Sequence, residues 1–383
     1  MFSTTQKIGI LGGGQLGKML CLAAANWDFK TYILDADGCP ASAVCTGHVP
    51  GDFKNYDDVL RFSRDMDVLT IEIEHVNTEA LHQLEREGKR IHPAPAALDI
   101  IKDKGLQKQF YREHALPTAD FQLFDDEKAL LAAVKNGSLA VPFVQKSRTA
   151  GYDGKGVAII RSEEDLATKL LPGACLTENL VPVRAEIAVI AAQNEAGEVA
   201  VFPAVEMDFH PEANLVEFLV CPARVSPLVE AEAQALAEQV IRAFGVCGVL
   251  AVEMFLTDAG ELLVNEVAPR PHNSGHHTID SAYVSQYQQH LLGICNLPLG
   301  DTAQKLPAVM VNLLGEAGQK GPVKYEGIEA CLALGGVNVH LYGKATTSPF
   351  RKMGHVTVVD ASLERAIKKA EFVKNTLRVV AAN

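Results

Sequence analysis

The sequence lacks the features of several classes of protein. A net positive charge is missing, because 47 Asp and Glu outnumber 35 Lys and Arg and give a formal net charge of -12. A polyanionic backbone requires a net basic surface, so we expect no nucleic-acid partner. No segment approaches the roughly 20 apolar residues of a membrane span, and no basic region precedes an apolar stretch at the start. We therefore expect a soluble, cytoplasmic protein without a membrane partner.

The eight cysteines show no metal-ligand spacing. They are scattered, no Cys-x-x-Cys occurs, and no paired histidines lie near them. This usage is typical of small buried residues in a reducing compartment. With 383 residues, of which 48% are apolar and 21% charged, the chain is long enough for two or three domains, each with its own core.

Residues 1–97 alternate short apolar strands with helical stretches. Strands are expected at 8–11, 31–34 and 68–73. Alternation of this kind predicts an α/β domain of Rossmann-like type, with a parallel sheet and helices on its faces.

The pattern changes after Pro93 and Pro95. Residues 98–298 begin with a helix expected over 99–114. Two further helices are expected in this range, near 162–170 and 227–244. The strands expected there lie at 140–146, 157–160, 184–192, 199–205, 249–256 and 262–267. This mixture predicts an α+β domain with mostly antiparallel sheets. A linker at 296–307 then leads into a small β-rich domain, 299–383, with strands at 337–341 and 355–359 and a helix at 363–377.

The first strand runs into a glycine-rich turn, Gly12-Gly-Gly-Gln-Leu-Gly17, and Asp35 follows 18 residues after Gly17. Glycines let backbone amides approach an anion at a helix N-terminus, and the acid can receive ribose hydroxyls. Taken alone, the pattern indicates an NAD-dependent dehydrogenase. A tight strand-to-helix turn, or a site for another ligand, explains it as well, and the rest of the sequence favours that interpretation.

A second glycine-rich segment joins two expected strands between Gln145 and Gly156. It contains three glycines and the cations Lys146 and Lys155, which is typical of a mobile loop that folds over phosphates. A long exposed hairpin turn would explain the glycines, but it would leave Lys146 at a strand end without a partner.

Glu253 and Glu266 flank a predicted hairpin turn. If Ala259 and Gly260 form a two-residue turn, the two carboxylates lie directly opposite each other on one face of the hairpin. A divalent cation would remove their repulsion, and oxygen ligands favour Mg²⁺. The alternative is that both side chains face solvent on a half-exposed hairpin.

The residues that follow Asn265 form a shaped loop, because Pro269, Pro271 and Gly275 forbid a regular strand or helix. The loop also carries Arg, Asn, Ser and three histidines. These histidines lack a ligand geometry fixed by a strand or helix, so a small-anion site is favoured over zinc.

Together these motifs resemble the ATP-grasp superfamily, and within it the N5-carboxyaminoimidazole ribonucleotide synthases of purine biosynthesis. The resemblance covers nearly the whole chain. It rests on the segments 12–17, 71–74, 145–156, 178–186, 265–276 and 351–355, together with Glu253. It implies an N-terminal Rossmann-like domain, a central ATP-grasp domain with two α+β subdomains, and a small C-terminal domain.

The resemblance implies that ATP binds between two sheets. Lys104 and Lys146 would contact its phosphates, Glu178 the adenine, and Glu186 the ribose. Mg²⁺, or Mn²⁺ in its place, would lie on Glu253 and Glu266. The further nucleotide contacts that it implies are Tyr152, Gly154, Lys155, Asn179, Leu180, Val181 and Asn265.

The implied reaction joins bicarbonate to 5-aminoimidazole ribonucleotide and converts ATP to ADP and phosphate, through carboxyphosphate. The implied substrate contacts are Gln15, Leu16, Glu72, Arg351 and Lys352, and the implied catalytic residues are Asp153, Arg270, His272, Asn273 and Lys352. The chain departs from the family at Ser348-Pro349-Phe350, where Arg-Pro-Gly is frequent, so one arginine contact to the substrate phosphate is not implied. A homodimer is expected. Another ATP-grasp ligase, such as a formate-using transformylase or a biotin carboxylase, and a non-catalytic nucleotide sensor remain alternatives.

Overall fold

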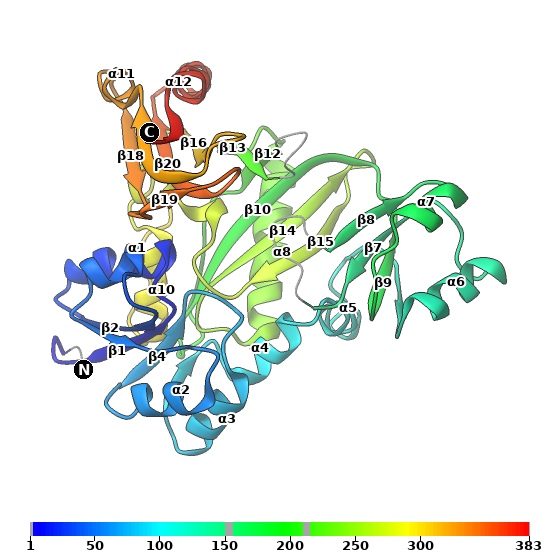
Figure 1. The fold of residues 1–383 in the computed structure, drawn as a ribbon, viewed down its shortest axis with the longest axis horizontal. Coiled ribbons are helices and arrows are strands. Elements are labelled where there is room, and N and C mark those ends of the chain that lie inside the picture. Colours follow the sequence, from blue (N-terminus) through cyan, green and yellow to red (C-terminus); the bar gives the residue numbers. More distant parts are fainter. Residues whose placement is uncertain (1–2, 150–155, 210–214, 383) are drawn as a thin grey trace.

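The computed structural model describes residues 3–149, 156–209 and 215–382. It contains a parallel sheet, a large antiparallel sheet through the middle, and a four-stranded sheet that stands apart to one side (Figure 1). The large sheet ends among the C-terminal strands, above the parallel sheet in this view. Within these ranges, no helix is both long enough and apolar enough to cross a membrane.

The N-terminal sheet has five parallel strands in the order β3-β2-β1-β4-β5. Its elements are β1 (Lys7–Leu11), α1 (Gln15–Ala25), β2 (Lys30–Asp35), η1 (Pro40–Ala43), β3 (Gly47–Pro50), α2 (Tyr56–Ser63), β4 (Val68–Ile71), α3 (Thr78–Arg86) and β5 (Arg90–His92). Alternate strand residues face opposite sides: Ile8 and Ile10 pack toward α1, and Leu11 and Leu69 toward α2 and α3. The predicted α/β architecture of this part is confirmed.

The prediction of a single helix over 99–114 is wrong. Two helices occur instead, α4 (Pro95–Ile101) and α5 (Lys104–Glu113). The break lies at Asp103, whose carboxylate accepts hydrogen bonds from the backbone N–H groups of Gly105 and Leu106. A side chain that caps the second helix in this way competes with continuation of the first.

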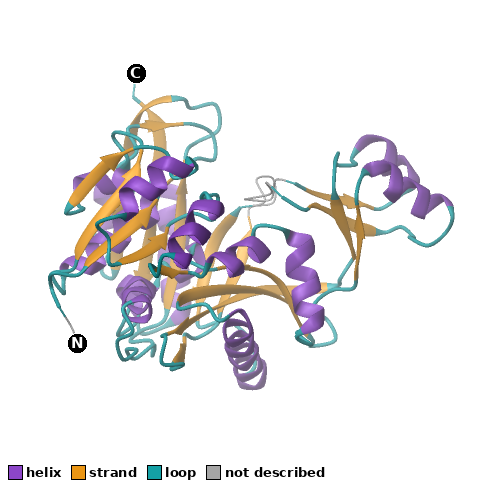
Figure 2. Ribbon diagram, turned by 90° about the horizontal axis from the view of Figure 1, so that it is seen from below, coloured by secondary structure: helices purple, strands orange, loops and turns teal. Residues whose placement is uncertain are grey.

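The four-stranded antiparallel sheet has the order β6-β9-β7-β8. Its elements are β6 (Phe121–Phe124), α6 (Glu127–Lys135), β7 (Phe143–Ser147), β8 (Val157–Ile160), α7 (Glu163–Thr168) and β9 (Cys175–Asn179). Helix α6 was not predicted. It buries Leu130 and Ala133 in a small core with Phe143 and Ile160. In Figure 2 the helices of this unit project away from the rest of the molecule.

The large sheet has the order β15-β14-β10-β12-β13-β16-β20-β18, with β11 on β10. Its central part comprises β10 (Val183–Gln193), β11 (Val199–Val201), β12 (Val205–Phe209), β13 (Val216–Cys221), β14 (Gly248–Thr257) and β15 (Leu262–Ala268), with α8 (Pro227–Phe244) against β10 and β14. The prediction of a single strand over 199–205 is wrong, because this segment is divided between β11 and β12. It is interrupted at Pro203, which has no N–H to donate to a ladder.

The C-terminal part continues the same sheet with β16 (Ala308–Leu314), β18 (Val337–Leu341) and β20 (Lys352–Val359). Strand β16 pairs with β13 from Phe218 to Cys221. The other elements from this point on are η2 (Asn273–Gly275), α9 (Thr278–Ser281), α10 (Gln286–Ile294), β17 (Gly321–Glu326), α11 (Ile328–Leu332), β19 (Thr346–Thr347), α12 (Leu363–Thr376) and β21 (Arg378–Ala381). The two boundaries between the three predicted domains therefore stay predictions, since one sheet crosses the second boundary.

Candidate active site

Glu72 lies at the carboxyl edge of the parallel sheet, directly after β4. The glycine-rich turn follows the neighbouring strand β1, and the chain runs from these two strands in opposite directions. This topological switch point is where open parallel sheets bind ligands. The Glu72 carboxylate accepts a hydrogen bond from Gly17 N–H, and a Cβ at Gly14 would lie 2.1 Å from Glu72 Oε1.

The amides of the glycine-rich turn already have acidic partners. Asp35 Oδ2 accepts from Gly13 N–H at 2.7 Å, beside the Glu72 contact to Gly17. Carboxylates thus hold the N–H groups that a dinucleotide pyrophosphate would need, which argues against NAD. Burial, helped by the charge of Asp35, raises the pKa of Glu72 to about 7.

The two residues predicted beside this turn are placed differently. Gln15 begins α1 and is half-buried. The side chain of Leu16 packs in the core between the sheet and α1. Both substrate contacts stay predictions.

The loop after β15 connects the central part of the chain to this switch point. Arg270 Nη2 lies 2.9 Å from Glu74 Oε1, in the segment that follows Glu72. His272 Nε2 is 3.7 Å from Glu253 Oε1, and Asn273 Nδ2 donates to Asn312 Oδ1 of β16 at 2.8 Å. Three predicted catalytic residues therefore bridge the N-terminal domain, the β14–β15 hairpin and the C-terminal strands.

Glu253 and Glu266 are cross-strand partners, as predicted, but the turn that joins their strands is not the predicted one. Thr257 N–H donates to Glu261 O, which leaves a three-residue loop with Gly260 at φ 86°. The longer loop shifts the pairing of the two strands by one residue from the predicted register. A bulge in β15, where Asn265 has no partner on β14, cancels this shift. The bulge turns the Asn265 side chain toward Lys146, whose Nζ donates to Asn265 Oδ1 at 2.8 Å.

Lys104 contacts Glu266 from the first turn of α5. The ammonium lowers the pKa of Glu266, whereas burial and the Glu266 charge raise the pKa of Glu253. Lys104 therefore already relieves part of the repulsion between the two carboxylates, and the metal site on them stays a prediction. Two carboxylates and the Asn265 amide oxygen still form an oxygen-rich group suited to Mg²⁺.

Glu178, at the end of β9, lies between two ammonium groups. Its Oε1 is 2.6 Å from Lys108 Nζ, and its Oε2 is 2.8 Å from Lys146 Nζ. Although burial favours the neutral acid, the two ammonium groups lower the pKa of Glu178. Sequence reasoning missed Lys108. The signal was its spacing of four residues from Lys104, which places both lysines on one face of α5.

The remaining residues predicted on the nucleotide side are split between described and undescribed parts of the chain. Glu186 lies on β10, where burial raises its pKa to about 7. The adjoining segment 179–181 links the four-stranded sheet to the large sheet, with Asn179 and Leu180 exposed and Val181 half-buried. Four of the predicted site residues lie outside the described part of the chain: Tyr152, Asp153, Gly154 and Lys155.

The two adjacent C-terminal cations have different surroundings. Lys352, at the start of β20, is half-buried, and its charge opposes the increase in the pKa of Glu253 that burial and Glu266 cause. Arg351 is exposed, and its Nη1 donates to the backbone oxygen of Thr346 at 2.7 Å. Phe350 before it has φ 59°, a left-handed conformation that glycine adopts without strain. The Arg351 guanidinium is thus held within its own loop, and the substrate contacts of both residues stay predictions.

Three imidazoles that the sequence did not single out as a group lie close together, with His276 and His355 buried and His340 half-buried. The ring centroid of His355 lies 4.7 Å from that of His276 and 4.5 Å from that of His340. Burial lowers the pKa of His276 and His355 well below the usual range, so both are neutral. In the described ranges, no three His, Cys, Asp or Glu side chains converge in a way that could hold a metal ion.

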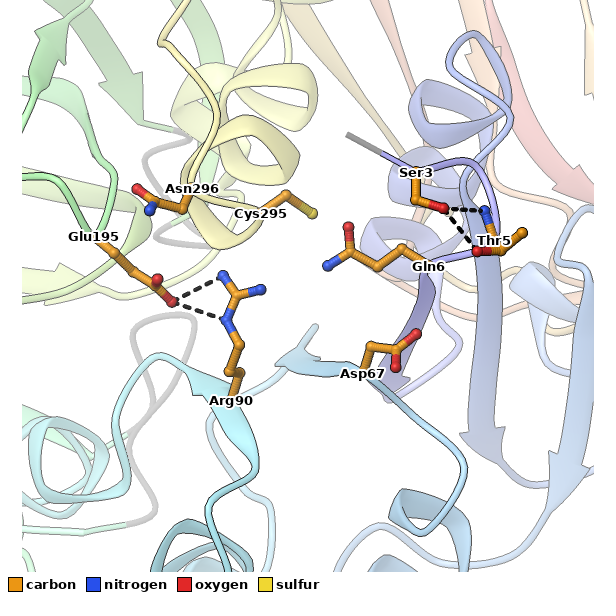
Figure 3. A pocket seen from close by; sticks show the side chains of 8 residues that line it. All are labelled: Ser3, Thr5, Gln6, Asp67, Arg90, Glu195, Cys295 and Asn296. Atoms are coloured by element: carbon orange, nitrogen blue, oxygen red, sulfur yellow. Dashed lines mark hydrogen bonds and ion pairs between the residues drawn. The ribbon is translucent and has the colours of Figure 1, made fainter. Parts of the chain in front are cut away.

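A separate hollow of about 500 Å³ lies at the amino ends of β1 and β5 (Figure 3). It contains none of the predicted site residues. Arg90 and His92 of β5 contact Glu195, between β10 and β11, at 2.9 and 3.0 Å. Its lining residues are Ser3, Thr5, Gln6, Asp67, Arg90, Glu195, Cys295 and Asn296. The contact of Arg90 and His92 with Glu195 joins the N-terminal and central parts of the chain, at the edge of the parallel sheet opposite to Glu72.

Comparison with known families divides the chain into three matches. Residues 5–102 match the ribonucleotide synthetase preATP-grasp domain, and residues 109–287 match the ATP-grasp domain. Residues 308–369 match the phosphoribosylaminoimidazole carboxylase C-terminal domain.

The N5-carboxyaminoimidazole ribonucleotide synthase of Brucella melitensis is 37% identical over 91% of this chain and 95% of its own length. The chain belongs to the N5-carboxyaminoimidazole ribonucleotide synthase family. A chloroplastic phosphoribosylaminoimidazole carboxylase of Vigna aconitifolia is 39% identical over 93% of this chain. The match spans only 64% of that longer relative, slightly less than two thirds.

Solved structures of family members share the whole architecture. The N5-carboxyaminoimidazole ribonucleotide synthetase of Thermotoga maritima is 41% identical, covers 99% of this chain and 100% of its own, and superposes with a TM-score of 0.91. The Aspergillus clavatus synthase, solved in complex with ADP and 5-aminoimidazole ribonucleotide, is 32% identical, with 97% and 99% coverage and a TM-score of 0.88. The ATP-grasp fold predicted from the sequence is therefore confirmed.

Proposed function

We propose that this chain joins bicarbonate to the amine of 5-aminoimidazole ribonucleotide, at the expense of ATP, to form N5-carboxyaminoimidazole ribonucleotide. ATP is converted to ADP and phosphate through carboxyphosphate. Support comes from membership of the family and from the relative solved with ADP and the ribonucleotide.

The Arg270 to Glu74 ion pair carries the proposal. It joins the loop next to the paired carboxylates to the segment that follows Glu72. A nucleotide held by Lys104 and Lys146 and a ribonucleotide held near Glu72 would thus be bound by adjoining parts of one structure. Adjacency of this kind is needed to transfer carboxyphosphate without loss to water.

Positioning and charge neutralisation account for most of the chemistry that we assign to this chain. The Lys104 and Lys146 ammonium groups would neutralise the phosphates while a bicarbonate oxygen attacks the γ-phosphorus and ADP leaves. The Lys352 ammonium would hold the anionic carboxyphosphate or the ribonucleotide phosphate. Asp153, outside the described residues, is proposed to take the proton that the attacking amine releases.

Glu253 and Glu266 would hold Mg²⁺, since their opposed carboxylates and the Asn265 oxygen suit a hard cation. When bound, this ion would screen the phosphate charges during transfer. The contact of Lys104 to Glu266 means that the ion and the ammonium compete for one carboxylate.

ADP release measured with and without each substrate tests the proposal. We expect turnover to require Mg²⁺, bicarbonate and 5-aminoimidazole ribonucleotide together. Turnover with formate in place of bicarbonate would indicate a transformylase, and nucleotide binding without ADP release would indicate a sensor. Either outcome would contradict the proposal. The homodimer and the cytoplasmic location stay predictions.

A further inference from the structure

Lys108 is a buried lysine that none of the roles above uses. Its side chain is 4% exposed, and its ammonium contacts the equally buried carboxylate of Glu178. Burial lowers the pKa of Lys108 to about 8, although the charge of Glu178 opposes the decrease. Burying an ammonium is costly, so a role that needs the charge at this place is the natural explanation.

The two lysines on Glu178 are held differently. Lys146 lies on β7, next to the second glycine-rich segment, and also donates to Asn265 beside the paired carboxylates. Lys108 donates to Thr118 Oγ1 at 2.5 Å, and the same hydroxyl donates to Val264 O at 2.7 Å. Lys108 is therefore linked through Thr118 to β15, whereas Lys146 reaches Asn265 beside the paired carboxylates.

Once a nucleotide is present, Lys146 and Lys108 would have different tasks. If Lys146 turns to the phosphates, as the proposed function requires, Lys108 becomes the remaining counter-charge of Glu178. A buried carboxylate without a counter-charge would take up a proton. Lys108 would prevent this and keep Glu178 an acceptor only.

Glu178 has an oxygen that can accept from a ligand. Lys108 Nζ lies 2.6 Å from Glu178 Oε1 and Lys146 Nζ 2.8 Å from Oε2, and a carboxylate oxygen can accept more than one hydrogen bond. Adenine presents an amino group at its six position, and guanine presents a carbonyl oxygen there. An ionised carboxylate accepts from the first and repels the second, whereas a protonated one could donate to the guanine oxygen.

We propose that Lys108 is a positioning residue for base selection, which holds Glu178 in place and ionised so that adenine is bound and guanine rejected. This inference rests on the proposed function in one respect, namely that the nucleotide base lies against Glu178.

The test compares the kcat/KM for ATP with that for GTP in the wild type and in Lys108→Met. We expect the ratio to fall by about 10- to 100-fold, the value of one hydrogen bond to a charged group. Lys108→Arg, which keeps the charge, should retain most of the ratio. The matched control is Lys128→Met, which removes an exposed lysine of α6 in the same part of the chain.

Binding of ADP and GDP, measured by calorimetry, gives the same comparison without turnover. If the wild type releases no ADP but still prefers ADP to GDP, the proposed function fails and the role of Lys108 is still tested. If Lys108→Met folds poorly, Lys108→Met with Glu178→Gln removes both charges and restores a neutral pair. That double variant should match Glu178→Gln alone in its base ratio, because the lysine acts only through the carboxylate. An unchanged ratio in Lys108→Met, whatever its activity, would overturn the inference.

Discussion

Glu253 lies directly opposite Glu266 in the β14–β15 hairpin, and of these two carboxylates it is Glu266 that forms the ion pair with Lys104. The two carboxylates therefore differ in charge state. Glu266 is held ionised by the ammonium, whereas burial and its neighbour raise the pKa of Glu253. The Glu253 side chain is 15% exposed and that of Glu266 43%, so solvent weakens the Lys104 contact but reaches Glu253 less.

This asymmetry predicts opposite effects of two matching substitutions on stability. Without Mg²⁺, Glu253→Gln should raise the free energy of unfolding, because at pH 8 the folded state must either protonate this carboxyl group or bury its charge opposite another carboxylate. Glu266→Gln should lower it by about 1 kcal/mol, because it removes the partner of Lys104 in a partly solvated pair. Urea denaturation at pH 8 in the presence of a chelator measures both. Equal changes of the same sign would show that the two acids are equivalent.

The same pair predicts how added metal acts. Mg²⁺, or Mn²⁺ in its place, should raise the Tm of the wild type, since an ion that binds only the folded state stabilises it. Both Gln variants should lose most of that increase. A full Mg²⁺ shift in both variants, measured by thermal denaturation with and without chelator, would place the ion elsewhere.

Glu72 predicts a pH dependence of stability. Its pKa is raised from 4.5 to about 7, so the folded state keeps a proton that the unfolded chain has already released. The free energy of unfolding should therefore fall as the pH rises from about 4.5 to 7, by on the order of 1–3 kcal/mol from this group. Glu72→Gln should show less of this decrease. Urea denaturation across this pH range compares the two, and identical slopes would exclude the assignment.

The neighbours Lys352 and Arg351 form a matched pair of cations. Lys352→Ala should raise the KM for 5-aminoimidazole ribonucleotide by about 10- to 100-fold, or abolish turnover, because a charge-assisted contact is lost. Arg351→Ala should have a much smaller effect, since its guanidinium holds Thr346 in its own loop. ATP binding by calorimetry should be retained in both. A larger effect of Arg351→Ala would contradict this division.

A substitution of Glu74 tests the ion pair with Arg270, which links the segment after Glu72 to the loop after β15. Glu74→Gln removes the charge that fixes Arg270 at 2.9 Å, without changing a residue to which we assign a substrate contact. We expect kcat to fall by about tenfold or more, the value of one charge-assisted contact, while the Kd for ATP is unchanged. Steady-state kinetics together with nucleotide calorimetry measure both quantities. A changed Kd for ATP with normal kcat would show that the pair serves the nucleotide side.

Much of the fold could be predicted because local signals agreed with it. Strands β1, β2 and β4 and helix α8 were expected close to their observed positions, since apolar periodicity and glycine or proline boundaries mark them. The edge and C-terminal strands, such as β3 and β17, were not expected, because they are short and their pairing is decided by distant residues.

The site was predicted with gaps that have physical causes. The pairing of Glu253 with Glu266 was correct although two local details were wrong, because the longer turn and the bulge at Asn265 cancel. Lys108 was missed because a lone lysine on a polar helix looks solvated until tertiary packing buries it. The surroundings of Arg351 depend on a contact within its own loop, which no spacing rule indicates.

The continuous large sheet has a consequence for fragments of this protein. Strand β16 covers the edge of β13 from Phe218 to Cys221, where Leu219, Val220 and Cys221 are buried. A fragment that ended before residue 308 would expose these unpaired backbone groups next to apolar side chains. Such an edge is a template for further strands, so the fragment should self-associate rather than remain a monomeric nucleotide-binding unit.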